Sequence, residues 1–305
     1  MMPARRVAAA ATKNIENNPM QRCRRPAHPT VWTENLTRRA NQRHNFILTK
    51  SAKRPRAQRM PSAGASSESW FRTYPGNTTE MQFDDVILGR RSIRGYKPDP
   101  VPKALIAEII GLAMRAPSSM NTQPWNFYII TGEPLDRIRA GNTERMVAGI
   151  PQSREFRTGQ AFAGKHRDRQ VGVAKQLFSA MGIARDDKDK RQDWVLRGFR
   201  QFDAPVCVII TYDRVLDGSD DTPFDCGAVA TALVNAAWSR GLGAVINSQG
   251  IMQSPVVREH AGIADDQVIM KSIALGWPDE TFPANAVVSE RKSVEEATVF
   301  VGFEN

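Results

Sequence analysis

The chain has 305 residues, of which 41% are hydrophobic and 24% are charged; this balance excludes collagen, a coiled coil and a wholly disordered chain. No apolar run approaches the roughly 18 residues that cross a bilayer, so we exclude an integral membrane protein. Three cysteines (Cys23, Cys207 and Cys226) without metal-ligand spacing exclude a disulfide framework, disfavour a structural metal and favour a reducing, cytoplasmic location.

The net charge of +10 is concentrated near the N-terminus. Residues 1–80 contain 15 Lys+Arg and 4 Asp+Glu, whereas residues 81–305 contain 27 and 28. The first 80 residues also hold only 8 Leu, Ile, Val or Phe, too few to bury a core, so we predict a basic, disordered extension. A transit peptide and a nucleic-acid contact through Arg22–Arg25 are alternatives. We favour a true start at Met60 or Met81, because the core-forming pattern begins only after Met81.

From Met81 the chain alternates between helical and strand patterns. Asp99–Pro102 precedes apolar residues at three- and four-residue spacing, which predicts an amphipathic helix that ends before Pro117. Trp125–Thr131 is aromatic and β-branched, and we expect a strand there. Residues 133–203 are polar with broken helical periodicity, so we interpret them as surface helices that form a mobile cap.

The second half of the chain continues this alternation. Pro205–Tyr212 predicts a strand that is buried on both faces. A helix should follow with Asp225 as its N-cap; it is apolar almost all round until Gly241 and therefore buried, for instance between subunits. Ser289–Phe303 ends in an apolar alternation that resembles a strand in need of a partner edge. Two further strands and a short helix are expected at Ala244–Asn247, Val268–Leu275 and Pro255–Ala261.

Four segments carry side chains suited to ligand binding. Gly89–Arg94 concentrates three guanidinium groups and a hydroxyl, which suits a phosphate and a second electron-rich group. Ala116–Trp125 follows a helix end with hydroxyl and amide side chains. Gly241–Gly250 runs from an apolar strand into a loop whose N–H groups can face a ligand, and Ser289–Lys292 adds a late basic pair. Each also has an ordinary alternative as a turn, a strand exit or a solvated surface.

Together these segments resemble the FMN-dependent nitroreductase family, and within it the nitrobenzoate-reductase-like branch. Arg90, Ser92 and Arg94 match the family's Arg-x-Ser-x-Arg/Lys signature, and Pro117–Trp125 matches its Pro-Ser-Ser-x-Asn-x-Gln-Pro-Trp block at every position. The similarity covers about residues 81–303. It implies an α+β, nitroreductase-like fold with a central mixed, mostly antiparallel sheet flanked by helices, in a homodimer with swapped C-terminal arms.

The resemblance also implies roles for individual residues. Arg90 and Arg291 would bind the FMN phosphate, assisted by Arg91 and Ser92, and Arg94 would lie near the N1/O2 edge of the flavin ring. A second subunit would supply a polar turn that contacts the ribityl chain and the ring. This turn contains Pro117, Ser118, Ser119, Asn121 and Gln123. The loop of Asn247, Ser248, Gln249 and Gly250 departs from the Glu-Gly of better-known relatives. It would place a backbone N–H near flavin N5, and the donor stays open among Ser248, Gln249 and Gly250.

The activity that the resemblance implies is FMN-dependent and NAD(P)H-driven. The enzyme would reduce nitroaromatic or quinone-like small molecules by ping-pong hydride transfer, without a side-chain acid or base. No Rossmann Gly-x-Gly-x-x-Gly motif is present, so NADH or NADPH should bind transiently against the flavin. An enoate or quinone reductase of the same superfamily is one alternative, and a non-catalytic flavin carrier is another. A third is a basic nucleic-acid-binding protein with an inert flavoprotein-like domain. For the folded part we expect no metal, membrane or nucleic-acid partner.

Overall fold

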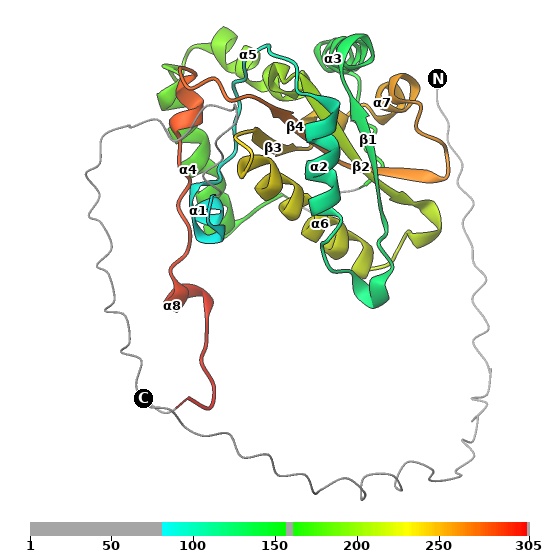
Figure 1. Cartoon of the computed structure of the whole chain (residues 1–305). Helices are drawn as coiled ribbons and strands as arrows, with labels where there is room; N and C mark the ends of the chain where they lie inside the picture. The colour runs from blue at the N-terminus through cyan, green and yellow to red at the C-terminus, as the bar shows by residue number, and fades with distance from the viewer. Residues whose placement is uncertain (1–80, 157–160, 304–305) are drawn as a thin grey trace, which may run out of the picture. The chain divides into compact units, whose positions relative to one another are not determined.

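The computed structural model describes residues 81–156 and 161–303, all within one compact unit of the chain. The basic extension predicted for residues 1–80 lies outside the described residues, as do its alternatives. The described residues form a four-stranded sheet with helices on both faces (Figure 1). This arrangement is the α+β architecture that the sequence predicted.

The sheet consists of β1 (Trp125–Ile130), β2 (Val206–Asp213), β3 (Gly243–Asn247) and β4 (Gln267–Gly276), in the order β1-β2-β4-β3. Neighbouring strands pair antiparallel, and a parallel bridge joins Ser92 to Ala244 in β3. β2 is buried from Val206 to Tyr212, because both of its faces are covered by helices. No strand of the described chain pairs with the outer edge of β1.

One helical layer covers each face of the sheet. On the first face, α2 (Lys103–Ala113) and α6 (Asp221–Trp238) bury Ile109 and Leu233 completely. On the second face, α3 (Gly132–Val147) and α7 (Ser254–Ala261) contribute Ile138 and Val257, both fully buried. Each such side chain contributes about 1.5–3 kcal/mol of transfer free energy. α3 therefore belongs to the core, although the polarity of residues 133–203 suggested surface helices.

The other helices complete the unit. α1 (Phe83–Gly89), α4 (Gly164–Ala180) and α5 (Lys188–Phe199) lie on the side of β3 in Figure 1. No described helix is long and apolar enough to span a membrane. Short single-turn helices are η1 (Ser119–Asn121), η2 (Gln201–Asp203), η3 (Arg214–Leu216), η4 (Gln249–Ile251) and η5 (Pro283–Ala286).

The start of α6 differs from the prediction. Asp225 is not its N-cap, because the helix begins at Asp221 and Asp225 lies in the second turn with its side chain buried. Pro223 occupies the first turn, where a missing N–H breaks no helical hydrogen bond. Asp225 instead accepts a hydrogen bond from the Ser119 N–H (3.0 Å). It thereby ties the turn before β1 to α6.

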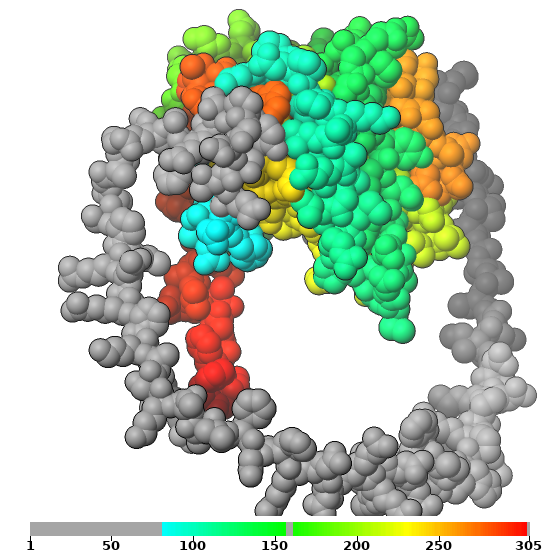
Figure 2. Space-filling model, viewed as in Figure 1, coloured from blue at the N-terminus to red at the C-terminus, as the bar shows by residue number. Residues whose placement is uncertain are grey.

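The C-terminal segment also differs from the predicted strand. It contains the short helix α8 (Val294–Ala297), which begins with a capping box between Ser293 and Glu296. Residues 298–303 pair with no strand of the described chain, and Val299, Phe300 and Val301 are 86%, 65% and 83% exposed. The segment projects away from the sheet and its helices (Figures 1 and 2). An apolar alternation forms a strand only where it reaches a partner edge, and within the described residues this segment reaches none.

Candidate functional site

The arginine-rich segment after α1 runs beside the outer edge of β3. The Ile93 N–H donates to the Ala244 carbonyl (3.1 Å), and Ile93 is fully buried. Gly243 permits this close approach, since a Cβ on Gly243 would lie 2.7 Å from the Ile93 side chain. Ser92 and Arg94, on either side of Ile93, are only partly buried. The segment therefore presents its polar side chains next to β3 while Ile93 anchors it.

Arg90 and Arg291 lie close enough to interact electrostatically, although they come from opposite ends of the folded unit. Partial burial and the nearby Arg291 both lower the pKa of Arg90. Neither guanidinium has a carboxylate partner among the described residues; Arg291 donates only to oxygens of Ser289 and Glu290 in its own segment. Two like charges held together cost electrostatic free energy, which a bound dianion such as a phosphate monoester relieves.

Asn285 fixes the shape of the segment that follows Arg90. Its Oδ1 accepts from the Arg94 N–H (2.7 Å) and the Gly95 N–H (3.1 Å), and its Nδ2 donates to the Gly95 carbonyl (2.8 Å). The Asn285 carbonyl accepts from Arg91 Nε (2.8 Å), and the Arg91 guanidinium lies 5.7 Å from the centre of the Trp238 ring. Burial lowers the pKa of Arg91 and of Arg94. Asn285 thus orients two of the candidate cofactor-binding arginines.

Arg197, near the end of α5, adds a further guanidinium to this region. Its Nη2 donates to the Arg94 carbonyl (3.4 Å), and its guanidinium stacks on Phe282 at 4.8 Å from the ring centre. Its Nη1 lies 3.3 Å from Asp203, but its Nε is buried and has no hydrogen-bond partner in the described part of the chain. A buried N–H without a partner is costly, so this atom indicates a missing acceptor beside Arg94.

The loop after β3 contains two N–H groups without a hydrogen-bond partner among the described residues. Asn247 Oδ1 accepts from the Gln249 N–H (2.9 Å), so this candidate donor is already used within the chain. Across residues 81–156 and 161–303, the N–H groups of Ser248 and Gly250 find no partner. Lys271 Nζ donates to Ser248 Oγ (2.6 Å), and burial, together with Arg154, lowers the pKa of Lys271.

The turn Pro117–Gln123 is strained and lies apart from these residues. Met120, Asn121 and Gln123 have φ angles of 49°, 60° and 47°, in the left-handed region that costs about 1–3 kcal/mol per non-glycine residue. Ser118 Oγ accepts from the Gln123 N–H (3.0 Å), which closes the turn. Ser119 is bonded to Asp225, as described above. Strain of this kind is concentrated at functional sites.

α6 separates the two halves of the predicted site. Asp225 holds the Pro117–Gln123 turn near the start of the helix, while Gly89 and Arg91 pack against Trp238 at its end. Thirteen helical residues at 1.5 Å each place these two points about 20 Å apart. One chain therefore gathers only part of the predicted set around β3 and α5, namely Arg90, Arg91, Ser92, Arg94, Arg291, Asn247, Ser248, Gln249 and Gly250.

The site also contains residues that the sequence analysis missed. Asn285 and Arg197 act through hydrogen bonds to Arg94 across 191 and 103 residues, respectively. Neither lies in a motif, and Arg197 is one of many charges in residues 133–203. No local pattern could have singled them out, because their roles arise only when the chain folds.

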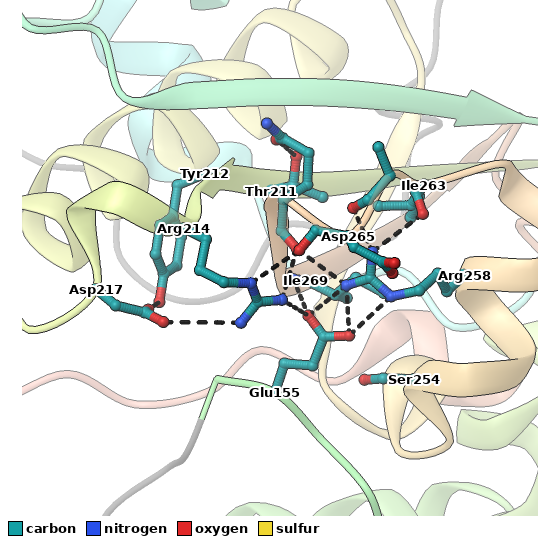
Figure 3. Close-up of polar contacts among 12 residues, drawn as sticks. Glu155, Thr211, Tyr212, Arg214, Asp217, Ser254, Arg258, Ile263, Asp265 and Ile269 are labelled. Carbon is teal, nitrogen blue, oxygen red and sulfur yellow. Dashed lines mark hydrogen bonds and ion pairs between the residues drawn. The ribbon is translucent and has the colours of Figure 1, made fainter.

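A second cluster of charged residues surrounds Glu155 (Figure 3). Its carboxylate accepts from Arg258 Nη2 (2.6 and 2.8 Å) and from the Ile269 N–H (2.9 Å). Arg214 lies 3.6 Å from the same carboxylate and 3.8 Å from Asp217. Because the charges in this cluster are paired with one another, its role is to fix residues 151–156 to β4 and α7.

Comparison with known proteins gives a consistent result. A model described as the nitroreductase family matches residues 87–277. The chain is 37% identical over 227 residues to a nitrobenzene nitroreductase of Ectopseudomonas oleovorans, covering 73% of this chain and 98% of that protein. It is 30% identical over 227 residues to a 4-nitrobenzoate reductase of Pseudomonas putida, covering 73% and 96%.

Solved structures agree in fold. The FMN and NADPH-dependent nitroreductase NfnB from sphigopyxis sp. strain HMH superposes with a TM-score of 0.69 at 29% identity, covering 73% of this chain and 100% of that chain. The FMN-dependent NfnB from Mycobacterium smegmatis, solved in complex with NADPH, gives a TM-score of 0.67 at 26% identity, covering 72% and 97%.

Proposed function

The chain belongs to the nitroreductase family, and on this basis we propose that it is an FMN-dependent oxidoreductase that uses NADPH or NADH to reduce small nitroaromatic acceptors. Its relatives named for nitrobenzene and 4-nitrobenzoate reduction, and the FMN- and NADPH-dependent structural neighbours, support this activity. We also propose a cytoplasmic location, with which the free thiols of Cys207 and Cys226 agree.

The observation that carries the proposal is the pair of unpaired guanidinium groups of Arg90 and Arg291. A phosphate bound by Arg90 and Arg291, with further contacts from Arg91 and Ser92, would offset the repulsion between the two positive charges. Arg94, with Arg197 beside it, brings positive charge to the edge of the flavin where negative charge develops on reduction. The buried Arg197 Nε without a partner and the unbonded N–H groups of Ser248 and Gly250 also fit a ring with several acceptor atoms.

The protein contributes position and charge to the reaction. When bound, FMN accepts a hydride from the nicotinamide and delivers it to the acceptor. A backbone N–H of this loop would lie near N5. Ser248 and Gly250 are favoured over Gln249 as the donor, because the Gln249 N–H already donates to Asn247 Oδ1. The chain thereby orients the ring without a side-chain acid or base.

We further propose that the active form is a homodimer. The Pro117–Gln123 turn lies about 20 Å from Arg91 along α6, so it can serve a flavin only from a second subunit. α6 also exposes Phe224, Gly227 and Thr231 on one side, at a spacing that places them on a single helical face. This face offers a surface on which two copies can meet.

The C-terminal arm, residues 298–303, has a matching surface on the second copy. A groove of about 740 Å³ lies between α2 and the outer edge of β1, lined by Val101, Ile106, Ile110, Trp125 and Phe127 among others. Its apolar lining suits Val299, Val301 and Phe303, and the unpaired edge of β1 can accept an added strand. We therefore place the partner's arm along β1.

The proposed activity is tested with purified protein reconstituted with FMN. Anaerobic NADPH or NADH should bleach the yellow colour, and nitrobenzene or 4-nitrobenzoate should restore it. An enoate serves as the control acceptor and should leave the protein bleached. A protein that binds no FMN, or whose bound FMN is not bleached by either nicotinamide, contradicts the proposal; recovery by the enoate alone assigns a different reductase.

A further inference from the structure

Buried polar side chains surround the loop after β3. Asn142, Gln201, Asn247, Gln253 and Ser272 are each 5% exposed or less. A buried amide is tolerated only when its hydrogen bonds are made. These bonds therefore define the geometry of the loop more tightly than apolar packing could, because hydrogen bonds are directional.

Asn142, on α3, spans both ends of η4. Its Nδ2 donates to the Gln249 carbonyl (2.9 Å) and to the Phe199 carbonyl at the end of α5 (3.0 Å). Its Oδ1 accepts from the Gln253 N–H (3.1 Å). The side chain is inaccessible to solvent, and both of its polar atoms are engaged. Asn142 thus holds the entry and the exit of the turn at the same time.

Asn247 holds the same turn from the opposite side. Its Oδ1 takes the Gln249 N–H, while its Nδ2 donates to the Gly198 carbonyl (2.7 Å) and to Gln201 Oε1 (3.0 Å). The two asparagines therefore engage both the N–H and the carbonyl of Gln249. The neighbouring N–H groups of Ser248 and Gly250 take no part in these contacts.

Two glycines allow close packing around the loop. A Cβ on Gly250 would lie 1.8 Å from Gln201 Nε2, and a Cβ on Gly198 would lie 2.0 Å from Gln249 Oε1. The Gln201 side chain therefore packs directly on the backbone of Gly250, and the Gln249 side chain packs directly on the backbone of Gly198 in α5. The position of the Ser248 and Gly250 N–H groups is therefore set by the same hydrogen bonds that fix Gln249.

We propose that Asn142 is a positioning residue for the flavin: by holding Gln249 and Gln253, it fixes the N–H groups of Ser248 and Gly250 that face the ring. The inference rests on the proposed function. Asn142 acts through the loop backbone, so its loss should alter the affinity for FMN and the ease of flavin reduction together. A purely structural residue of the same helix should alter only stability.

The test compares Asn142→Ser and Asn142→Asp with Ile138→Ala in the full chain. Ile138 lies one turn earlier on α3, is fully buried, and packs in the core on the other side of the sheet from α6. Thermal melting of each apoprotein reports folding. Quenching of flavin fluorescence gives the FMN dissociation constant, and equilibration with a redox dye gives the ratio of reduced to oxidised bound flavin.

Asn142→Ser should weaken FMN binding and shift the dye equilibrium by about fivefold each, which corresponds to about 1 kcal/mol. Asn142→Asp keeps the acceptor for the Gln253 N–H but turns a carboxylate oxygen toward two carbonyls. Its effect on FMN binding and on the dye equilibrium should therefore be at least as large. If the serine variant does not fold, the aspartate variant is used for the test. Ile138→Ala should melt earlier with both readouts within about twofold of wild type. Asn142 variants that behave like Ile138→Ala overturn the inference, whereas a wild-type protein that binds no FMN overturns the proposed function itself.

Discussion

At the scale of single residues, the candidate site depends on half-buried arginines that have no carboxylate partner among the described residues. Arg90, Arg91 and Arg94 all lose hydration, which lowers the pKa of each, and none forms a salt bridge within the part of the chain that the structure describes. Desolvated cations are retained in proteins where a partner repays their cost. At this site we propose that the partner is a bound anion and not a side chain.

Cys207 gives a prediction, at the scale of one residue, of how the stability of the protein depends on pH. It is fully buried in β2, and burial raises the pKa of its thiol from 9.0 to about 12. Because the folded pKa is the higher one, this contribution to stability is intact below about pH 9 and is lost as the pH rises toward 12. From this group alone, the free energy of unfolding should fall by up to about 1.4 kcal/mol per pH unit in that window.

Urea unfolding of wild type and Cys207→Ala at several pH values above 8 isolates this contribution. Other groups titrate in the same range, but they do so in both proteins. The wild-type free energy of unfolding should therefore fall more steeply with pH than that of the variant. Equal slopes would show that the thiol ionises in the folded protein as readily as in the unfolded one.

The candidate site was only partly predictable at this scale. Arg90, Arg91, Ser92 and Arg94 stood out because they lie within five residues of one another, and the family resemblance supplied their expected roles. Asn285 and Arg197 were not, since each is an ordinary residue until folding brings it to Arg94. The proposed N5 donor was open among Ser248, Gln249 and Gly250 in the sequence. The bond from the Gln249 N–H to Asn247, which only the three-dimensional structure reveals, favours the other two.

Among the elements, the connection from α3 to α4 depends on Glu155. Glu155→Gln should lower the free energy of unfolding by about 2 kcal/mol, because charge-assisted hydrogen bonds to Arg258 and the Ile269 N–H are lost or weakened. Glu133→Gln is the matched control: Glu133 pairs with Arg137 one turn along α3, and both side chains are well exposed. The control should cost less than about 0.5 kcal/mol. Urea titration of both variants measures the difference, and equal losses would mean that the Glu155 cluster adds no more than a surface pair.

Some helices and strands could be predicted from the sequence more reliably than others. β2 was predictable because a run of β-branched residues buried on both faces has few alternative structures. The start of α6 was not, because both Asp221 and Asp225 precede apolar residues and only the hydrogen bond from Ser119 shows that Asp225 has another use. The arm at residues 298–303 has the composition of a strand but pairs with no strand of the described chain, and we propose that its partner edge is β1 of a second copy.

At the scale of the whole molecule, we propose that the active protein contains two copies of the chain. Removing residues 298–305 should convert a dimer to monomers at micromolar concentration, because the groove beside β1 then loses its occupant. FMN affinity should fall as well, since the Pro117–Gln123 turn reaches a flavin only across the interface. Sedimentation velocity of wild type and the truncated chain checks this. A truncated protein that stays dimeric would show that the α6 face suffices, and a monomeric wild type with full FMN affinity would contradict the dimeric site.

The most direct test of the central claim compares FMN with riboflavin, which lacks only the phosphate. Wild type should bind FMN at least about 100-fold more tightly, as expected for several charge-assisted hydrogen bonds. Arg90→Ala/Arg291→Ala should bind the two ligands within about tenfold of each other. Arg115→Ala/Arg137→Ala removes the same charge from exposed positions and should keep the wild-type preference. A double variant of Arg90 and Arg291 that still prefers FMN by the wild-type margin would contradict the account.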